Sequence, residues 1–362
     1  MREQLRQHST HRLKHSGRYR LLEIMTTKTK AFAANEPKGK FQPFEFEAGN
    51  LGDEQVEIKV QSCGICHSDL SMLNNDWGMT EYPFVGGHEA VGEIIALGKN
   101  AKGLKVGDKV GLGWNSETCG YCEQCVAGYQ INCPTLEGTI VDRHGGFADK
   151  VRCHWQWAIK LPDALDMSKA GPLFCGGITV FNPFVQNNIS PTDKVGVVGI
   201  GGLGHLALQF ADKWGCEVTA FTTNLSKSDE LKKLGADYVV NTRDESALKE
   251  LKGKFNMILV TVNVPLNWDL YMNALSPKGK LHIVGAVLEP IPIGAFDLIM
   301  RQRFVTGTAT GSPQVVSKML EFCARHNIET VTEKFPMSKI NEAFEHLESG
   351  KARYRIVLEN DF

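Results

Sequence analysis

Three absences limit what this chain can be. Its 362 residues carry a formal net charge of −1. A chain so close to neutral gives no reason to expect nucleic acid or an anionic membrane surface as a partner. No uninterrupted apolar run approaches the roughly 20 residues that a membrane-spanning helix needs. No secretory signal pattern accompanies the ten cysteines, and this combination predicts a reducing compartment and a cytoplasmic protein.

The first 24 residues differ from the rest in their concentration of basic side chains. Two explanations stay open, an Arg-rich targeting segment or a disordered tail, the latter including an extension upstream of a true start at Met25. The segment has no clear amphipathic pattern, which favours the tail. The basic residues are Arg2, Arg6, Arg12, Lys14, Arg18 and Arg20.

The rest of the chain changes character near residue 190. Before residue 160, short alternating or apolar runs broken by glycine predict strands, for example at 56–60, 91–96 and 106–110. After residue 190, strand-like runs at 194–198, 217–221, 238–240, 257–262 and 281–284 alternate with helical runs at 204–210 and 229–234. This alternation predicts an α/β fold with a parallel sheet that carries helices on both faces. Helices expected at 315–323 and 340–347 return the chain to the first domain.

Four closely spaced cysteines form the most specific motif. Cys119, Cys122, Cys125 and Cys133 are so close in sequence that they cannot all pair as unstrained disulfides, but they can surround one tetrahedral Zn²⁺. A redox pair or a disulfide scaffold is the alternative, and neither uses four cysteines at this spacing in a chain of this length. Since four protein ligands leave no position for substrate, we predict a structural zinc.

A glycine-rich turn follows the strand at 194–198 and precedes a helix, as the dinucleotide-binding fingerprint requires. Its first glycine would make the tight turn, its second would let the backbone approach the pyrophosphate, and its third would pack helix against strand. A turn without a ligand is the alternative. The predicted cofactor-binding residues of this turn are Gly199, Gly201, Gly202, Leu203 and Gly204.

The residues about 20 positions further on indicate which cofactor is used. NAD-binding proteins place an Asp or Glu there, on the ribose 2′-hydroxyl. This chain has Thr222, Thr223 and Lys227 instead, which suit a 2′-phosphate. We therefore predict NADP(H), the alternative being an ordinary polar loop in an NAD enzyme.

A second metal site is suggested by Cys66, His88 and Cys175. These residues lie far apart in sequence, so spacing alone cannot assemble them, and a buried cysteine or core histidine is commoner than a ligand. No histidine stands four positions after His88, which excludes the HExxH motif of metalloproteases.

Taken together, the motifs resemble those of zinc-dependent medium-chain dehydrogenases, within them the cinnamyl alcohol dehydrogenase group. The resemblance runs from about Lys28 to Leu358. It rests on the runs 63–70 and 87–92, the four-cysteine loop, the glycine turn and the closing sequence 351–355. The resemblance implies a GroES-like catalytic domain at 25–176, completed by 308–362, and a Rossmann NADP-binding domain at 177–307. It also implies a homodimer.

Carried over position by position, the resemblance assigns a role to each matching residue. Cys66, His88 and Cys175 become the catalytic zinc ligands, which makes two zinc ions per chain with the four-cysteine site. Glu89 becomes either an alternating ligand or a carboxylate behind the ligands. Asp69 becomes a carboxylate behind the ligands, and Ser68 becomes the hydroxyl that passes the proton onward. His67, Thr179 and Gly285 are expected at the cofactor. The remaining cysteines, Cys63, Cys153, Cys216 and Cys323, are expected as small core residues.

Two departures from the family affect the site. Many relatives have a histidine at the position of Ser71, where it hands the proton to solvent, so water must complete the relay here or proton transfer limits turnover. The stretch 138–146 looks shorter than in plant relatives and lacks their tryptophan, which weakens any transfer of substrate preference. Trp77 and Trp114 are candidate pocket residues, and plain packing is their alternative role.

The expected function is therefore an NADP(H)-dependent zinc alcohol dehydrogenase that reduces aromatic or medium-chain aldehydes. Its partner is a small molecule, with neither nucleic acid nor membrane involved. Two alternatives stay open: an NAD-linked dehydrogenase for simple or polyhydroxylated alcohols, and a non-catalytic nucleotide-binding protein that kept the fold. The intact ligand set disfavours the non-catalytic alternative.

Overall fold

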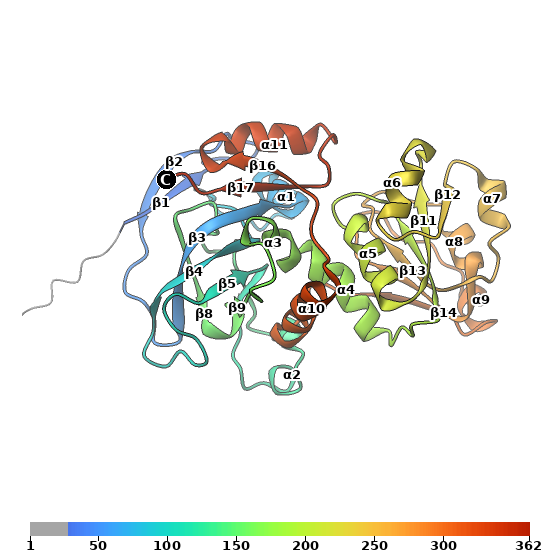
Figure 1. Cartoon of the computed structure of the whole chain (residues 1–362), viewed down its shortest axis with the longest axis horizontal. Coiled ribbons are helices and arrows are strands. Elements are labelled where there is room, and N and C mark those ends of the chain that lie inside the picture. The colour runs from blue at the N-terminus through green and yellow to red at the C-terminus, as the bar shows by residue number, and fades with distance from the viewer. Residues whose placement is uncertain (1–27) are drawn as a thin grey trace, which may run out of the picture.

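The computed structural model describes residues 28–362, so the basic segment 1–24 and the start-site question lie outside the described residues. The chain forms two lobes that meet around α4 and α10 (Figure 1). We call the lobe built on a seven-stranded sheet the β lobe, and the lobe built on a six-stranded parallel sheet the α/β lobe. No helix from residue 28 onward combines the length and apolar character needed to cross a membrane.

The β lobe contains the first and last strands of residues 28–362. Its sheet runs in the order β16-β17-β3-β4-β5-β9, and β8 also pairs with β3. Because β17 pairs antiparallel with β3, with Ile356 opposite Ile65, the C-terminal segment completes this lobe. The strands are β1 (Lys28–Ala33), β2 (Gln42–Glu47), β3 (Gln55–Ile65), β4 (Ala90–Leu97), β5 (Lys109–Leu112), β6 (Asn115–Glu117), β7 (Glu137–Gly138), β8 (Lys150–His154), β9 (Ile159–Lys160), β16 (Thr332–Pro336) and β17 (Arg355–Glu359).

The α/β lobe is a doubly wound sheet. Its strands run in the order β12-β11-β10-β13-β14-β15, and all neighbouring pairs are parallel. In sequence order this is 3-2-1-4-5-6, the arrangement that binds dinucleotides where the order reverses beside the first strand. The strands are β10 (Lys194–Val198), β11 (Glu217–Thr222), β12 (Tyr238–Asn241), β13 (Phe255–Val260), β14 (Leu275–Ile283) and β15 (Phe304–Gly307).

The helix ends follow from local side-chain chemistry. Helix α7 begins after Asp244, whose carboxylate accepts hydrogen bonds from two free backbone N–H groups. Helix α5 ends at Trp214, and the next residue, Gly215, has a φ of 101° that favours glycine. The helices are α1 (His67–Asn74), α2 (Glu123–Val126), α3 (Met167–Ala170), α4 (Gly176–Gln186), α5 (Gly204–Trp214), α6 (Ser228–Lys233), α7 (Glu245–Lys249), α8 (Trp268–Ala274), α9 (Ala295–Ile299), α10 (Pro313–His326) and α11 (Ile340–Glu348).

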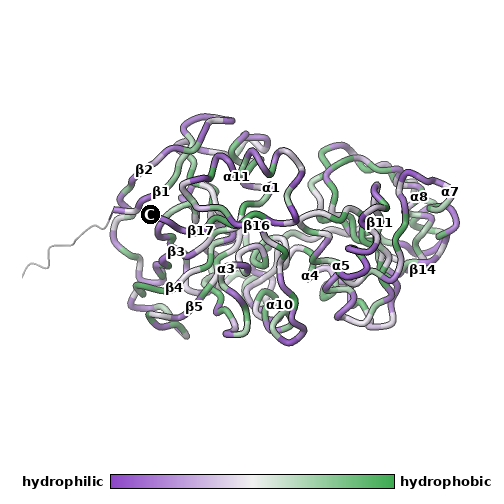
Figure 2. Tube along the Cα trace, turned by 45° about the horizontal axis from the view of Figure 1, so that its top comes forward, coloured by the Kyte–Doolittle hydropathy of each residue, from purple (hydrophilic) through white to green (hydrophobic). Residues whose placement is uncertain are grey.

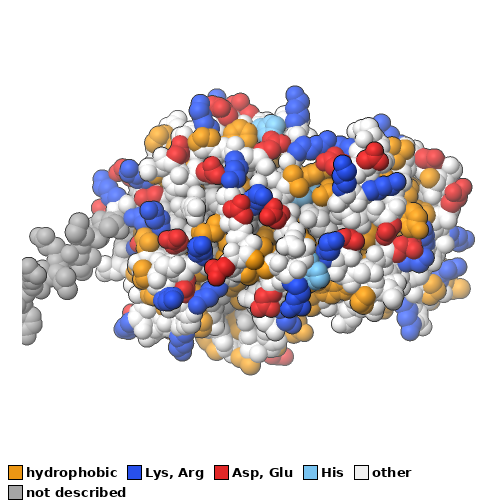
Figure 3. All heavy atoms as spheres, viewed as in Figure 1, with side chains coloured by type: hydrophobic (Ala, Val, Ile, Leu, Met, Phe, Trp, Pro, Cys, Tyr) orange, Lys and Arg blue, Asp and Glu red, His pale blue; other side chains and the backbone are white. Residues whose placement is uncertain are grey.

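One hydrophobic core continues from lobe to lobe. It joins Val91 and Ile159 of the β lobe to α4, α10 and one face of the six-stranded sheet. A second core fills the β lobe, and a third covers the other face of the parallel sheet. Apolar and polar segments alternate along the chain, and the outer loops near β2 and α7 are mostly polar (Figure 2). On the face in Figure 3, acidic and basic side chains are interspersed.

The expected fold class, a mostly β domain plus a doubly wound parallel sheet, is confirmed. Several strand ends differ from expectation; in the α/β lobe, β13 stops at Val260, and β14 begins at Leu275, ahead of the expected residue 281. The early start follows from an irregular register that pairs Phe255 with Leu275 before the regular ladder. The residue boundaries proposed for the two domains stay a prediction.

Candidate functional site

A cleft of about 750 Å³ opens between the two lobes. The β lobe contributes the end of β3 and the start of α1, and the α/β lobe contributes the ends of β13 and β14. Apolar and aromatic side chains alternate with a few polar groups along its wall, as in small-molecule sites. Its lining includes Cys66, His67, Ser68, Ser71, Asp76, Trp77, Trp114, Ile131, Leu136, Cys175, Thr179, Leu203, Gly285 and Leu288.

Two sulfurs and an imidazole converge at the bottom of this cleft. Cys66 directly precedes α1, His88 lies just before β4, and Cys175 directly precedes α4. The two Sγ atoms are 3.8 Å apart, and His88 Nε2 lies 3.2 Å from Cys175 Sγ. Zinc–sulfur bonds of about 2.3 Å place tetrahedral ligands about 3.8 Å apart, so the sulfur spacing fits a metal ion.

Asp69 fixes the orientation of this group. Its Oδ1 accepts hydrogen bonds from the backbone N–H of Gly87 (2.8 Å) and from His88 Nδ1 (3.0 Å), and its Oδ2 accepts from the N–H of Cys66 (2.9 Å). With its proton held on Nδ1, the His88 ring presents the Nε2 lone pair to the sulfurs. The hydrogen bond with Cys175 lowers the pKa of Cys66 and favours a thiolate. A thiolate is the form in which a cysteine binds a metal.

Glu89 and Arg355 form a buried ion pair beside the sulfurs. Both side chains are almost completely shielded from solvent. Burial raises the pKa of Glu89 to about 7, while the Arg355 charge acts to lower it. One carboxylate oxygen of Glu89 belongs to the group of donor atoms within 4.8 Å of one another, and its Oε2 has no hydrogen-bond partner. A buried oxygen without a partner can serve as a further ligand.

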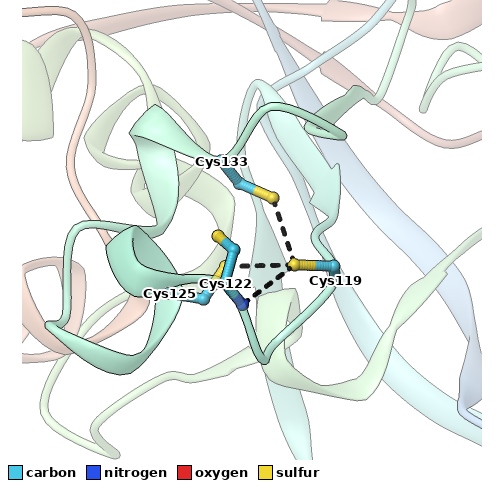
Figure 4. A group of neighbouring side chains, drawn as sticks. All are labelled: Cys119, Cys122, Cys125 and Cys133. Carbon is cyan, nitrogen blue, oxygen red and sulfur yellow. Dashed lines mark hydrogen bonds between the residues drawn. The ribbon is translucent and has the colours of Figure 1, made fainter.

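The four-cysteine loop also forms a donor group (Figure 4). Cys119 Sγ lies 3.9 Å from Cys125 Sγ and 3.6 Å from Cys133 Sγ, which again matches the edge of a tetrahedron around zinc. Backbone N–H groups of Tyr121 and Cys122 lower the pKa of Cys119. None of these cysteines forms a disulfide, so the disulfide alternative is wrong for this loop.

The glycine turn has the geometry that each of its glycines predicts. Gly199 has a φ of 88°, and a Cβ at Gly204 would overlap the carbonyl oxygen of Gly199, so both positions need glycine. A Cβ added at Gly201 would have no neighbouring atom within 4 Å, so there is open space for a ligand beside this residue. Thr261 Oγ1 donates to the Gly199 carbonyl at 2.6 Å and holds the turn in place.

The loop after β11 is built by its own side chains. Thr222 Oγ1 accepts the backbone N–H of Asn224 (3.1 Å), and the Asn224 side chain accepts the N–H of Ser226 (2.9 Å). Thr223 is exposed, and burial, with some contribution from Arg353, lowers the pKa of Lys227. The Thr222 hydroxyl is thus partly occupied within the loop, and Thr223 and Lys227 are the freer groups.

The cleft brings together seven of the other predicted site residues. His67, Ser68, Thr179, Leu203 and Gly285 line it, whereas the 222–227 loop and the remaining glycines of the turn do not. Ser68 Oγ lies 3.8 Å from Cys66 Sγ. The rings of Trp77 and Trp114 meet edge to face at 5.9 Å, and Trp114 lies 5.0 Å from the His88 ring. Both tryptophans therefore form part of the cleft wall.

Sequence reasoning missed several residues of the cleft. Arg355 belongs to the closing run 351–355, but only its buried partner Glu89 reveals a role. Asp76 is a carboxylate in the lining, and a carboxylate after a helix gives no signal in sequence. Residues 308–310, Ile131, Leu136 and Leu288 also line the cleft, and no motif contains them.

Comparison with known proteins places the chain in a family. Residues 52–163 match the alcohol dehydrogenase GroES-like domain, and residues 202–325 match the zinc-binding dehydrogenase domain. An aldehyde reductase, AdhA, of Synechocystis sp. is 52% identical over 91% of this chain and 98% of the relative.

Solved structures agree with these matches. A cinnamyl alcohol dehydrogenase of Sorghum bicolor superposes with a TM-score of 0.88 at 35% identity, over 92% of this chain and 98% of that one. A cinnamyl alcohol dehydrogenase of Helicobacter pylori, complexed with NADP(H), superposes with a TM-score of 0.84 at 29% identity, over 92% of this chain and 99% of that one. The predicted resemblance is thereby confirmed, and the chain belongs to the zinc-dependent medium-chain alcohol dehydrogenases, in the cinnamyl alcohol dehydrogenase group.

Proposed function

We propose that this protein is an NADP(H)-linked, zinc-dependent aldehyde reductase that also runs in the direction of alcohol oxidation. The observation that carries the proposal is the convergence of Cys66, His88 and Cys175 at the bottom of an aromatic-walled cleft between the lobes. Three protein donors leave one position for a substrate oxygen. The Synechocystis relative named as an aldehyde reductase supports the direction.

The chain's own residues would hold and orient the reactants. Cys66, His88 and Cys175 would bind the catalytic zinc, with Asp69 keeping His88 in the required tautomer. When bound, zinc polarises a carbonyl oxygen as a Lewis acid, and the nicotinamide supplies or accepts the hydride. The Ser68 hydroxyl, 3.8 Å from Cys66 Sγ, would pass a proton to or from the substrate oxygen. Trp77 and Trp114 would exclude water and contact an aromatic or medium-chain aldehyde.

The four-cysteine site would hold a second, structural zinc. Its sulfurs supply all four tetrahedral positions, so Cys119, Cys122, Cys125 and Cys133 would shape the lobe without taking part in the reaction. Zinc analysis of the purified protein should give two ions per chain. One ion per chain would contradict the assignment of one of the two sites.

NADP(H) is proposed as the cofactor because the loop after β11 contains no carboxylate. Thr222, Thr223 and Lys227 present hydroxyls and a positive charge, where an acidic residue would repel a 2′-phosphate. The Helicobacter pylori relative was solved with NADP(H), which agrees with this choice. The test compares kcat/KM for NADPH and NADH with an aromatic aldehyde. A clear preference for NADH would favour the NAD-linked alternative.

We also propose a homodimer joined through the free edge of the α/β sheet. Strand β15 ends the sheet, and Phe304 and Val305 are 48% and 39% exposed there. Helix α9 adds Phe296 and Ile299, at 75% and 66% exposure. An apolar edge strand invites pairing, and a two-fold axis would continue the sheet from β15 to the partner's β15.

Sedimentation velocity tests this proposal on the full chain. The wild-type protein should sediment as a dimer, and a charge placed on the edge strand, Val305→Lys, should shift it to monomer. A monomeric wild-type protein would contradict the proposed interface.

We propose a cytoplasmic location because the cysteines are free thiols. All ten are free, and the six in the two donor groups would need to be reduced to bind zinc. Fractionation of the native cells, with the protein followed by immunodetection, tests this.

A further inference from the structure

The closing run 351–355 lies against the glycine turn, although it belongs to the β lobe. A Cβ built on Gly202 would stand 3.0 Å from Arg355 Nη1 and 3.5 Å from the Tyr354 carbonyl oxygen. The run enters β17, which pairs with β3 in the β lobe. A segment of one lobe therefore forms part of the wall of the nucleotide-binding turn in the other.

Tyr354 fixes this segment on both sides. Its hydroxyl donates to Glu230 Oε1 of α6 at 2.6 Å, and its ring stacks on the His205 ring of α5 at 4.8 Å and 9°. Its backbone N–H donates to the Val331 carbonyl at 3.1 Å. Since Glu230 follows Lys227 by less than one helical turn, the segment reaches the loop after β11.

Arg353, the residue before Tyr354, is exposed at this junction. Its backbone N–H donates to Glu333 Oε1 at 2.7 Å, and its guanidinium lies 5.5 Å from the Tyr354 ring centroid. This guanidinium takes part in none of the ion pairs formed within residues 28–362. Its position is therefore held by the backbone while its charge stays free.

Lys227 lies close enough to be affected by that charge. Burial chiefly lowers the pKa of Lys227, and Arg353 lowers it further, against the opposing effect of Glu230. The Glu230 carboxylate is already engaged by Tyr354. Two neighbouring cations without an ion-pair partner repel each other, and an anion between them would relieve that repulsion.

We infer that Arg353 and Lys227 form a clamp, with one cation from each lobe, for the 2′-phosphate of NADP(H). The inference rests on the proposed cofactor. A phosphate dianion matches both the paired charges and the planar donor fork of an arginine. The clamp adds to the cofactor site a specificity-determining residue that stands far from the glycine turn in sequence.

Calorimetric titration of the full chain with 2′,5′-ADP and with 5′-AMP tests the clamp. These two probes differ by the 2′-phosphate alone. Arg353→Gln should weaken 2′,5′-ADP binding roughly tenfold or more and leave 5′-AMP binding unchanged, because the lost contacts are charge-assisted hydrogen bonds. Arg353→Lys should retain part of the affinity. The loss should shrink at high salt, since the site is open to solvent.

Arg325→Gln is the matched control, because Arg325 is an exposed arginine in the last turn of α10 that the argument does not use. It should bind both probes as the wild-type protein does. Equal weakening of both probes by Arg353→Gln, or no weakening, would overturn the clamp. A wild-type protein that fails to prefer 2′,5′-ADP would instead overturn the proposed cofactor, and the clamp with it.

Discussion

The two donor groups of this protein differ in how the chain assembles them. The four-cysteine site comes from one loop, 119–133, whereas Cys66, His88 and Cys175 come from the starts of two helices and a loop before a strand. All three of the latter residues are buried, and Cys66 and Cys175 line the cleft, while Cys119 and Cys122 are half-buried at the surface of the loop.

Because of this difference, the site that is easiest to identify from the sequence is not the site that can react. A contiguous motif can be read from spacing, and its four sulfurs fill a tetrahedron, so no position is left for a substrate. When Glu89 stays paired with Arg355, the dispersed group has three protein donors, one fewer than the four-cysteine site, and it lies where two lobes meet. The motif that is easiest to find in the sequence is therefore the one that cannot perform the reaction.

The strongest test of this separation removes one ligand of the dispersed group. Cys66→Ala should lower kcat/KM for aldehyde reduction at least about 1000-fold, because a Lewis acid contributes several kcal/mol to the transition state. Zinc content should fall from two ions per chain to one, with little change in the melting temperature. Steady-state kinetics, metal analysis and thermal unfolding measure these effects.

The matched control is Cys323→Ala, which removes a buried thiol of α10 that belongs to neither donor group. It should keep both zinc ions and nearly full activity. Full activity in Cys66→Ala would refute the catalytic assignment.

The second test removes one sulfur of the contiguous group. Cys122→Ser should lose the structural zinc and lower the melting temperature by roughly 10 °C, because metal binding contributes to folding. At assay temperatures below the melting temperature of Cys122→Ser, kcat/KM of this variant should be less than about tenfold lower than that of the wild-type protein. Calorimetry and metal analysis report the two effects separately.

Cys216→Ser serves as its control, since Cys216 Sγ faces the Ser190 carbonyl at 3.6 Å and a hydroxyl can make the same hydrogen bond. Two zinc ions and an unchanged melting temperature in Cys122→Ser would mean that the loop is not a structural metal site.

The two groups also show how far sequence reasoning reaches. Strand and helix patterns predict most elements of the fold, since hydrophobic periodicity is a local property. The glycine turn is predicted for the same reason. Cys66, His88 and Cys175 could be predicted only through family resemblance, because their proximity is produced by tertiary packing. The sequence predicts no role for Arg355 or Asp76, since a lone charged residue carries no local signal of which residues it will contact.

Arg355 offers a third test, on the surroundings of the dispersed group. Arg355→Met leaves the buried Glu89 carboxylate without its partner, and we expect it to cost about 3–5 kcal/mol of unfolding free energy. Urea unfolding gives the value. Adding Glu89→Gln should recover part of the loss, because the double variant no longer buries an unpaired charge. Additive losses would show that the two side chains stabilise the protein independently.

The smallest expected effect concerns the departure at Ser71, which lines the cleft near Ser68. A serine hydroxyl cannot act as a base near neutral pH, whereas an imidazole can. If proton release to solvent limits turnover, Ser71→His should raise kcat by less than tenfold. The kcat of this variant should then depend on a group that titrates near pH 6.5, and its solvent isotope effect should be smaller than that of the wild-type protein. Ser71→Asn is the control, since it adds bulk and polarity without a titrating group. An unchanged isotope effect in Ser71→His would show that water already carries the proton out of this cleft faster than the other steps proceed.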